Sequence, residues 1–311
     1  MKKIIFIILL IIFLVVTVFT AWLYLFPEKA LKSISDSERG KAGLELFEVD
    51  VNGMSMKYLS GGQGEPLLLI HGFGANKDNW TRISRYLTPH FKIIAPDLIG
   101  FGESARPKDV DYSILSQMER VRAFADKLDL KRFHLGGSSM GGNISAAFAS
   151  EHPEYIKSLL LLAPGGVYSA DDSELKGLLK QGKNPLIATD RESYNEVIDF
   201  VFYKKPFIPS PIIDAFAAEA IRNKPINDIV FKAIHERPLA TDEVLQNCSI
   251  PTLVIWGKND RVLHWSGAKI LGDIMKNATI TVFEETGHLP MIEKPKESAE
   301  EFLKFTKSLQ N

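Results

Sequence analysis

The sequence predicts a doubly wound, mostly parallel α/β sheet with an inserted helical cap, preceded by one N-terminal transmembrane helix. From about residue 43, short and nearly continuous apolar runs alternate with amphipathic stretches. Such alternation is typical of strands and helices wound around a parallel sheet. The alternation stops between residues 166 and 245 and then resumes. The chain also begins with a long apolar span that carries no charge.

Residues 4–26 form this apolar span, which contains only two threonines among its 23 residues. As a helix it extends roughly 35 Å, enough to cross a hydrocarbon layer of about 30 Å. A cleaved signal has an apolar region of only about 7–15 residues and small residues before the cleavage point. Here Phe19 stands where a small residue would be needed if cleavage followed Ala21. We therefore interpret residues 1–26 as an uncleaved signal anchor that binds the bilayer through residues 4–26. Secretion after cleavage is the alternative.

The charges that flank the span bear on its orientation. Lys2 and Lys3 favour a cytoplasmic N-terminus, with the folded remainder of the chain on the periplasmic or extracytoplasmic side of a single-pass protein. Lys29 and Lys32 follow the span, so the charge difference across it is small. Residues 27–42 are polar and charged, and we interpret them as a linker with about one helical turn.

The overall composition is that of an ordinary globular protein, with 45% hydrophobic and 24% charged residues among 311. These proportions exclude a disordered chain, a collagen and a small disulfide-stabilised scaffold. The formal net charge is −1, and without a basic excess we expect no nucleic-acid partner. Cys248 is the single cysteine of the sequence, so an internal disulfide and a cysteine-based metal site are both excluded.

Two segments, residues 43–165 and 246–311, carry the predicted sheet. The stretch around Asn52 and Gly53 alternates apolar and polar residues like a β-hairpin. Five apolar runs are typical of strands buried on both faces, namely 66–70, 92–96, 133–137, 158–163 and 252–256. Helical patterns lie between them at 114–130, 143–152 and 266–277. The two segments together are therefore predicted to form one core.

Residues 166–245 have helical segments but no good strand, and we predict that they form the cap. The cap carries the aromatic residues Phe200, Phe202, Tyr203, Phe207 and Phe216. In one interpretation these side chains only seat the cap on the core. In the other, two or three of them line an apolar substrate pocket.

The segment Gly137-Ser138-Ser139-Met140-Gly141 follows a predicted buried strand directly and precedes a helical pattern. A sharp turn that pushes one side chain outward is crowded, so its neighbours must lack a Cβ atom. The pattern G-x-S-x-G has this setting, and only Ser139 has glycine two residues away on both sides. We therefore predict Ser139 as a nucleophile near a helix N-terminus, which favours developing negative charge. The competing interpretation is a glycine-rich turn with an ordinary serine.

A serine hydroxyl needs a base, and the base needs a carboxylate that orients it. Asp260 follows the predicted strand 252–256, and His288 follows the next predicted strand. Because parallel strands end at one edge of a sheet, we expect Asp260 as the acid and His288 as the base beside Ser139. His264 is a rival base, but it shares the loop of the acid and is badly placed between acid and nucleophile.

An acyl-transfer site also needs hydrogen-bond donors for the oxyanion. The strand 66–70 leads into a loop in which glycines flank Phe73 on both sides. We predict the backbone N–H groups of Phe73 and Met140 as these donors. We interpret His71 as a residue that braces the loop, and residues 97–104 as a structural loop with no catalytic role.

The motifs HGFGANKDNW, PDLIGFGES, GGSSMGGNIS, PTLVIWGKND and ETGHLPMIEKP together resemble the α/β-hydrolase superfamily. The resemblance covers residues 43–311, and within the superfamily the chain is similar to bacterial lipases and esterases and to membrane-anchored monoacylglycerol lipases. It implies ester hydrolysis by a triad of Ser139, His288 and Asp260, with no cofactor and no metal. The chain departs from dehalogenases and soluble epoxide hydrolases, which have aspartate at the nucleophile position. It also lacks the HGGG-type oxyanion loop of another esterase branch.

The sequence thus predicts a carboxylic ester hydrolase, a lipase or esterase that cleaves mono- or triacylglycerols through an acyl-enzyme on Ser139. A small-molecule lipid ester suits both the apolar cap and the anchor, because such a substrate partitions into the membrane where the enzyme is held. The enzymatic alternative is a carbon–carbon-bond hydrolase of the same fold, since these enzymes also use Ser-x-Gly-Gly turns. Outside catalysis, the alternatives are a ligand-binding protein of this fold and a membrane scaffold.

Overall fold

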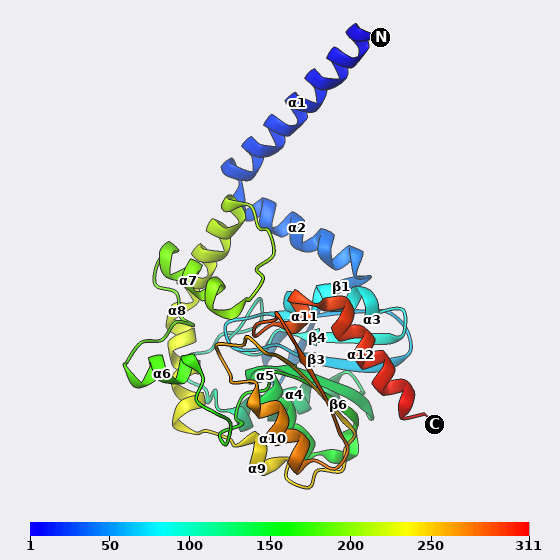
Figure 1. Cartoon of the computed structure of the whole chain (residues 1–311), viewed down its shortest axis with the longest axis vertical. Coiled ribbons are helices and arrows are strands. Elements are labelled where there is room, and N and C mark those ends of the chain that lie inside the picture. The colour runs from blue at the N-terminus through cyan, green and yellow to red at the C-terminus, as the bar shows by residue number, and fades with distance from the viewer. Residues whose placement is uncertain (311) are drawn as a thin grey trace.

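The computed structural model describes residues 1–310, and its centre is an eight-stranded sheet in the order β1-β2-β4-β3-β5-β6-β7-β8 (Figure 1). The strands are β1 (Leu44–Val51), β2 (Met54–Gly61), β3 (Glu65–Ile70), β4 (Phe91–Pro96), β5 (Phe133–Ser138), β6 (Ile156–Leu162), β7 (Thr252–Gly257) and β8 (Ala278–Phe283). The β1–β2 and β2–β4 pairs are antiparallel, and all other pairs are parallel. The predicted fold class is confirmed. Asn311, the end of the predicted second core segment, lies outside the described residues.

The sheet is buried on both faces, which explains why its central strands are almost wholly apolar. In β6, Leu159 and Leu161 pack into the hydrophobic cluster on one face, while Leu160 and Leu162 pack into the cluster on the other. Successive side chains of a strand point to opposite faces, so a leucine at each position serves both layers.

Helices cover the two faces of the sheet. The helices of the core are η1 (Lys77–Trp80), α3 (Thr81–Leu87), α4 (Ile114–Lys127), α5 (Met140–Glu151), η2 (Pro153–Tyr155), α10 (Ser266–Ile274), α11 (Pro290–Glu293) and α12 (Pro295–Ser308). Buried side chains of α4, α5 and α10 join one hydrophobic cluster, and those of α3, α11 and α12 join the other. The result is a three-layer α/β domain.

Between β6 and β7 the described chain contains helices and loops but no strand. These helices are α6 (Glu174–Lys180), α7 (Arg191–Val201), α8 (Ser210–Glu236) and α9 (Thr241–Val244). Figure 1 shows α6, α7 and α8 together at one side of the sheet. The helical content matches the expected cap, while its boundaries at residues 166 and 245 stay a prediction.

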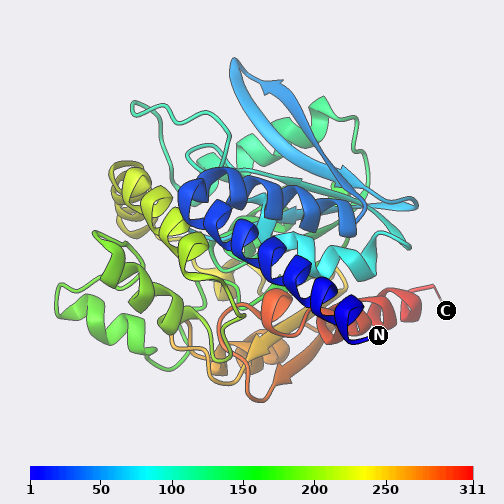
Figure 2. The ribbon, with the colours of Figure 1, turned by 90° about the horizontal axis from the view of Figure 1, so that it is seen from above.

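The N-terminal helix α1 (Lys2–Leu25) projects away from the rest of the molecule (Figure 1). It is long and apolar enough to cross a membrane, and its apolar side chains are exposed along most of its length. Only its last turn touches the body, where Leu23 packs against Ala30 and Ile212. Figure 2 shows from above how α1 extends over the helix that follows it.

The structure corrects the interpretation of residues 27–42 as a linker with about one helical turn. Residues Pro27–Lys41 form a 15-residue helix, α2, that contacts α8, α3 and β1. Its ends suit a helix, because Pro27 begins it and Arg39 and Lys41 lie in its last turn, where the dipole favours cations. Ala30 and Arg39 are buried against the body. The polar composition had suggested solvent on all sides, but a buried alanine and the ion pairs of Glu38 with Arg85 and of Arg39 with Asp78 join the helix to the body.

Candidate active site

Ser139 lies at the turn between β5 and α5, with a φ of 55° and a ψ of −121°. An L-residue rarely adopts this positive φ, so the surrounding structure must hold it there. The N–H of Ser139 donates to the carbonyl of Leu162 at 3.1 Å, and its own carbonyl accepts the N–H groups of Asn143 and Gly165. These bonds to the neighbouring strand end and to α5 fix the strained turn.

The glycines of the G-x-S-x-G pattern are required by close backbone approaches. A Cβ atom on Gly137 would lie 2.2 Å from the carbonyl oxygen of Gly141. A Cβ atom on Gly141 would lie 2.1 Å from the carbonyl oxygen of Ile70 at the end of β3. Helix α5 can therefore begin directly against the sheet only when both positions lack a side chain.

The two adjacent serines have different environments. The Ser138 side chain is fully buried at the end of β5, and its Oγ has no hydrogen-bond partner among residues 1–310. Ser139 is partly exposed at the turn. Within the described residues no hydrogen bond joins its Oγ to His288, and such bonds often tighten only when substrate binds. The structure thus leaves Ser139 as the serine that a substrate can reach.

Asp260 and His288 come together in the loops after β7 and β8. The Nδ1 atom of His288 lies 2.8 Å from Oδ2 of Asp260, and both side chains are buried. The same Oδ2 accepts the Nε1–H of Trp256 at 3.1 Å. The Oδ1 atom accepts the N–H groups of Val262 and Leu263 at 2.8 and 3.0 Å. Four donors converge on this carboxylate, so the proton of the neutral imidazole is on Nδ1 and the Nε2 lone pair is left free.

The rival histidine, His264, makes different contacts. Its Nδ1 lies 2.8 Å from Oγ of Ser266 and accepts the N–H of the same residue, at the start of α10. Both oxygens of Asp260 are already occupied by other donors. The structure therefore pairs the acid with His288 and leaves His264 at a helix end.

The predicted oxyanion donors lie on either side of Ser139. A Cβ atom on Gly72 would be 3.0 Å from the Cβ of Ser139, so the loop after β3 runs against the serine. Phe73 follows in this loop, and among residues 1–310 its N–H donates to no acceptor. The N–H of Met140 belongs to the first residue of α5, where the helix itself offers no acceptor. Both N–H groups are available to a ligand at Ser139.

His71 braces this loop, as the sequence indicated. It is fully buried, and its Nδ1–H donates to the carbonyl of Gly72 at 2.8 Å. Its Nε2 accepts the N–H of Leu98 at 3.0 Å. Burial lowers the pKa of His71, and only the neutral imidazole satisfies both contacts. The ring therefore joins two loops and does not act as a base.

A carboxylate that the sequence analysis did not single out, Glu293, joins the loop of His288 to the cap. Its Oε1 accepts the N–H of Gly287 at 2.9 Å. Its Oε2 accepts the N–H groups of Tyr203 and Lys204 at 3.0 and 2.8 Å. Burial raises the pKa of Glu293, although these N–H groups act in the opposite direction. Its place in the same motif as His288 is the signal that could have found it.

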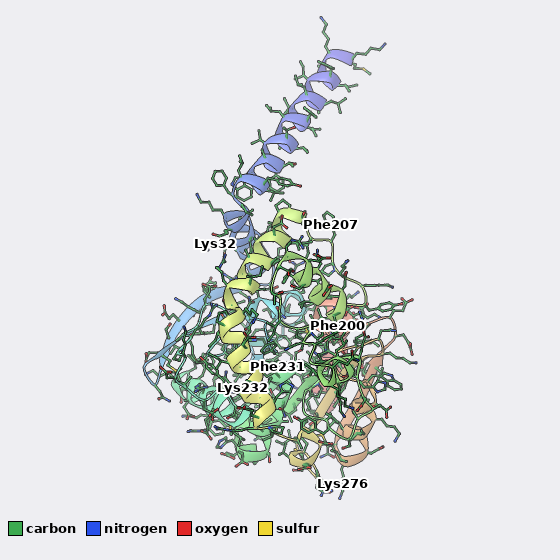
Figure 3. All side chains as sticks on the ribbon, turned by 90° about the vertical axis from the view of Figure 1, so that its left-hand side faces the viewer. Lys32, Phe200, Phe207, Phe231, Lys232 and Lys276 are labelled. Atoms are coloured by element: carbon green, nitrogen blue, oxygen red, sulfur yellow. The ribbon has the colours of Figure 1, made fainter. Side chains whose placement is uncertain are left out.

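The cap aromatics serve different purposes. Phe200 is buried against Leu175 and Val262, beside the loop of the acid, and this seats the cap. Phe207 is 92% exposed and contacts neither the core nor the site, as Figure 3 shows at the outer end of α8. Phe231, which the sequence analysis did not consider, packs edge-on against Phe73 with ring centroids 5.5 Å apart.

Two hollows are lined in part by the loop between β3 and η1, residues 71–76, which we call the oxyanion loop. A cavity of about 110 Å³ is lined by Gly74 and Asn76 from this loop and by Phe216 and Glu219 from the cap. Burial raises the pKa of Glu219. A groove of about 450 Å³ shares the last three residues and extends along α2 as far as Glu28. Among residues 1–310, no cluster of three or more His, Cys, Asp or Glu side chains is arranged to hold a metal ion.

Comparisons with known proteins agree with this fold. A family model of the alpha/beta hydrolase fold matches residues 65–188. Lipase 1 of Psychrobacter immobilis is 37% identical over 289 residues, which cover 90% of this chain and 89% of that protein. Monoacylglycerol lipase abhd6-B of Xenopus laevis is 32% identical over 286 residues, covering 83% and 84% of the two chains. The crystal structure of a membrane phospholipase A, a bacterial virulence factor, matches with a TM-score of 0.90 at 38% identity and covers 100% of both chains. The chain therefore belongs to the α/β-hydrolase fold family.

Proposed function

We propose that this protein is a carboxylic ester hydrolase that cleaves lipid esters through an acyl-enzyme on Ser139. The observation that carries the proposal is the buried pair of Asp260 and His288, 2.8 Å apart, in the loops after β7 and β8, at the same edge of the sheet as the strained Ser139 turn after β5. The names of the relatives, which include lipase, monoacylglycerol lipase and phospholipase A, support a lipid ester as the substrate class.

The mechanism follows from the geometry. The Nε2 atom of His288 takes the proton of Ser139 while Oγ attacks the ester carbonyl. The N–H groups of Phe73 and Met140 stabilise the negative charge that develops on the carbonyl oxygen. The alcohol leaves with the proton from His288, and a water molecule then releases the acyl group by the same steps in reverse order. Asp260 keeps the imidazole in orientation and stabilises its protonated form.

The shape of the molecule supports a substrate that arrives from a membrane. Helix α1 is apolar on all sides, and its end is packed against α2 and α8. The groove along α2 is lined by Glu28, near the end of α1, and by Asn76 of the oxyanion loop. We propose this groove as the entry for a lipid ester that leaves the bilayer beside α1.

For the organisation of the chain, we propose an anchor over residues 1–26, a cap over 166–245 and a core formed by 43–165 and 246–311. We also propose that the protein is a single-pass membrane protein with a cytoplasmic N-terminus. Accessibility of a C-terminal tag to protease in intact cells and in spheroplasts tests the orientation. N-terminal sequencing tests retention, since a mature chain that begins near Trp22 would contradict the anchor.

The experiment for the activity uses the full-length protein in detergent micelles. We expect a fluorophosphonate probe to label the native protein and to leave Ser139→Ala unlabelled. Hydrolysis of p-nitrophenyl esters from acetate to palmitate, followed by mono- and triacylglycerols and phospholipids in mixed micelles, then gives the substrate range. Lack of both labelling and ester hydrolysis in the native protein would contradict the proposal and favour a binding protein.

A further inference from the structure

We propose that Arg39, a residue of the membrane-proximal helix α2, is a positioning residue for the oxyanion loop. The proposal rests on the proposed function, in which the N–H of Phe73 in this loop stabilises the oxyanion. It adds that the rate of the reaction depends on a contact made from outside the α/β core. Arg39 lines the groove along α2 and, among residues 1–310, makes no hydrogen bond or ion pair with the triad, so we infer that it acts on a short soluble ester through the residues that it binds.

The contact is a bidentate ion pair. Nε of Arg39 donates to Oδ1 of Asp78 at 2.6 Å, and Nη2 donates to Oδ2 at 2.7 Å. Only 8% of Arg39 is exposed, so solvent screens the pair weakly. Paired N–H···O bonds of this kind fix the orientation of both groups as well as their distance. Arg39 thereby holds η1, the short helix that contains Asp78, against α2.

The neighbour of Asp78 ties the same short helix to the core. Lys77 is 1% exposed, and its backbone N–H donates to Oδ1 of Asp97 at 2.7 Å. Its Nζ binds Oδ2 of Asp97 at 2.8 Å and Oε1 of Glu103 at 2.7 Å. Burial alone would lower the pKa of Lys77, but the charge of Asp97, with Asp78 and the hydrogen bonds, raises it above its usual value.

These bonds fix one end of the oxyanion loop. The loop leaves β3 at Ile70, passes Phe73 and enters η1 at Lys77. The sheet holds its first end, and η1 holds its second end. Since η1 is fastened to the core through the bonds of Lys77 to Asp97 and through the buried Trp80, and to α2 through Arg39, removal of the guanidinium releases its support on the side of α2. A shift of Phe73 by a fraction of an ångström then weakens its hydrogen bond to the oxyanion.

Contacts other than the ion pair of Arg39 hold α2 on the body. The effect of Arg39 on the oxyanion loop can therefore be tested separately from the attachment of α2. Ala30 packs in a small apolar cluster with Leu23 and Ile212. Glu38 pairs with Arg85 of α3. The ion pair of Arg39 is therefore not needed to keep α2 on the body. Because it binds η1, it instead fixes the end of the oxyanion loop.

The test uses Arg39→Met and Arg39→Lys in the full-length protein in detergent micelles, with p-nitrophenyl butyrate as substrate. Active sites are counted by fluorophosphonate titration. We expect Arg39→Met to lower kcat per active site by about 10–100-fold, below the loss from removing a whole oxyanion donor. The KM should stay within about twofold, because ground-state binding is not affected. Arg39→Lys should restore part of kcat, since it returns the charge but not the bidentate geometry. The control Lys41→Met, at an exposed cation of the same helix, should match the native protein.

A double variant distinguishes an effect of Arg39 on the position of the oxyanion loop from an effect on the stability of the fold. Arg39→Met leaves the carboxylate of Asp78 without its partner, which lowers the melting temperature. In Arg39→Met with Asp78→Asn that charge is removed, so the melting temperature should recover while kcat stays low. A native kcat per active site in Arg39→Met, or a kcat that recovers together with the melting temperature, would overturn the proposal. If the native protein itself neither labels nor hydrolyses esters, the proposed function fails instead, and the two failures are thus distinguishable.

Discussion

The carboxyl edge of the sheet and the membrane-proximal side of the molecule are built on different principles. At the sheet edge, Asp260 receives four N–H groups and Ser139 is held in a strained turn by the chain around it. On the membrane-proximal side, α1 is almost free of contacts with the body. Changes at the edge should therefore alter chemistry at constant stability, whereas changes in α1 should alter location at constant chemistry. Helix α2 is the place where the two regions meet.

The largest expected effect comes from Ser139→Ala, which should lower kcat for p-nitrophenyl butyrate by about 10³–10⁶-fold because triad members act as a unit. The fold should stay intact, which circular dichroism and the melting temperature check. The matched control is Ser138→Ala, whose buried Oγ has no partner among residues 1–310 to lose. If Ser138→Ala abolishes activity and Ser139→Ala does not, the nucleophile is assigned to the wrong serine.

Asp260→Asn should lower kcat by about 10³–10⁴-fold. An amide presents an NH₂ group to donors that need an acceptor, so the tautomer and orientation of His288 are lost. The measurement is single-turnover acylation by p-nitrophenyl butyrate. Asp273→Asn, at an exposed aspartate paired with Lys269, serves as the control. An Asp260→Asn enzyme with nearly native acylation would show that another group orients His288.

Glu293→Ala should lower kcat by about tenfold, because the loop of His288 loses its attachment to the cap and misplaced catalytic groups cost rate. Glu293→Gln should lie between this variant and the native enzyme, since one amide oxygen can still accept. The control is Glu300→Gln, at an exposed residue of the neighbouring helix α12. Steady-state kinetics on short and long esters measures the effect, and native kcat in Glu293→Ala would mean that the cap does not position the base.

The sequence predicts the sheet edge well and the membrane-proximal side poorly, for a physical reason. A side chain is excluded at Gly137 by the carbonyl of Gly141 and at Gly141 by the carbonyl of Ile70, so the need for glycine at both positions marks the turn in the sequence. The apolar span also identifies α1, because an uninterrupted run of apolar residues of this length is typical of a helix that lies in lipid. The contact between α2 and η1 depends on Arg39 meeting Asp78, 39 positions further along the chain. Nothing in a local pattern separates this buried arginine from an exposed one.

The ion-pair network near α2 predicts a small pH effect on stability. Burial would raise the pKa of Glu103, but Lys77 and Arg39 hold it below its usual value. A carboxyl with a lowered folded-state pKa stabilises the protein above its unfolded pKa of about 4.3, and this contribution is lost as the pH falls through the folded value. Glu103→Gln should therefore lower the melting temperature at pH 7 by at most about 4 °C, since the side chain is half exposed. The difference should shrink as the pH falls below about 4.3 and vanish below the folded-state pKa of Glu103, and a difference that grows toward acid pH would contradict the assignment.

The smallest expected effect on chemistry comes from removal of α1. A chain that begins at Pro27 keeps α2 whole, and with it the pair of Arg39 and Asp78. It loses only the packing of the last turn of α1, so kcat on p-nitrophenyl butyrate should stay within about twofold. The rate on monoacylglycerol in vesicles should fall more, because the enzyme is no longer concentrated at the bilayer. A chain that begins at Ala42 is the informative control, since it also lacks α2 and should lose activity on the soluble ester. If the chain from Pro27 still sediments with vesicles and keeps both rates, α1 is not what localises the enzyme. If the chain from Pro27 also loses activity on the soluble ester, α1 itself influences the active site. That result would contradict the expectation that changes in α1 alter location and not chemistry.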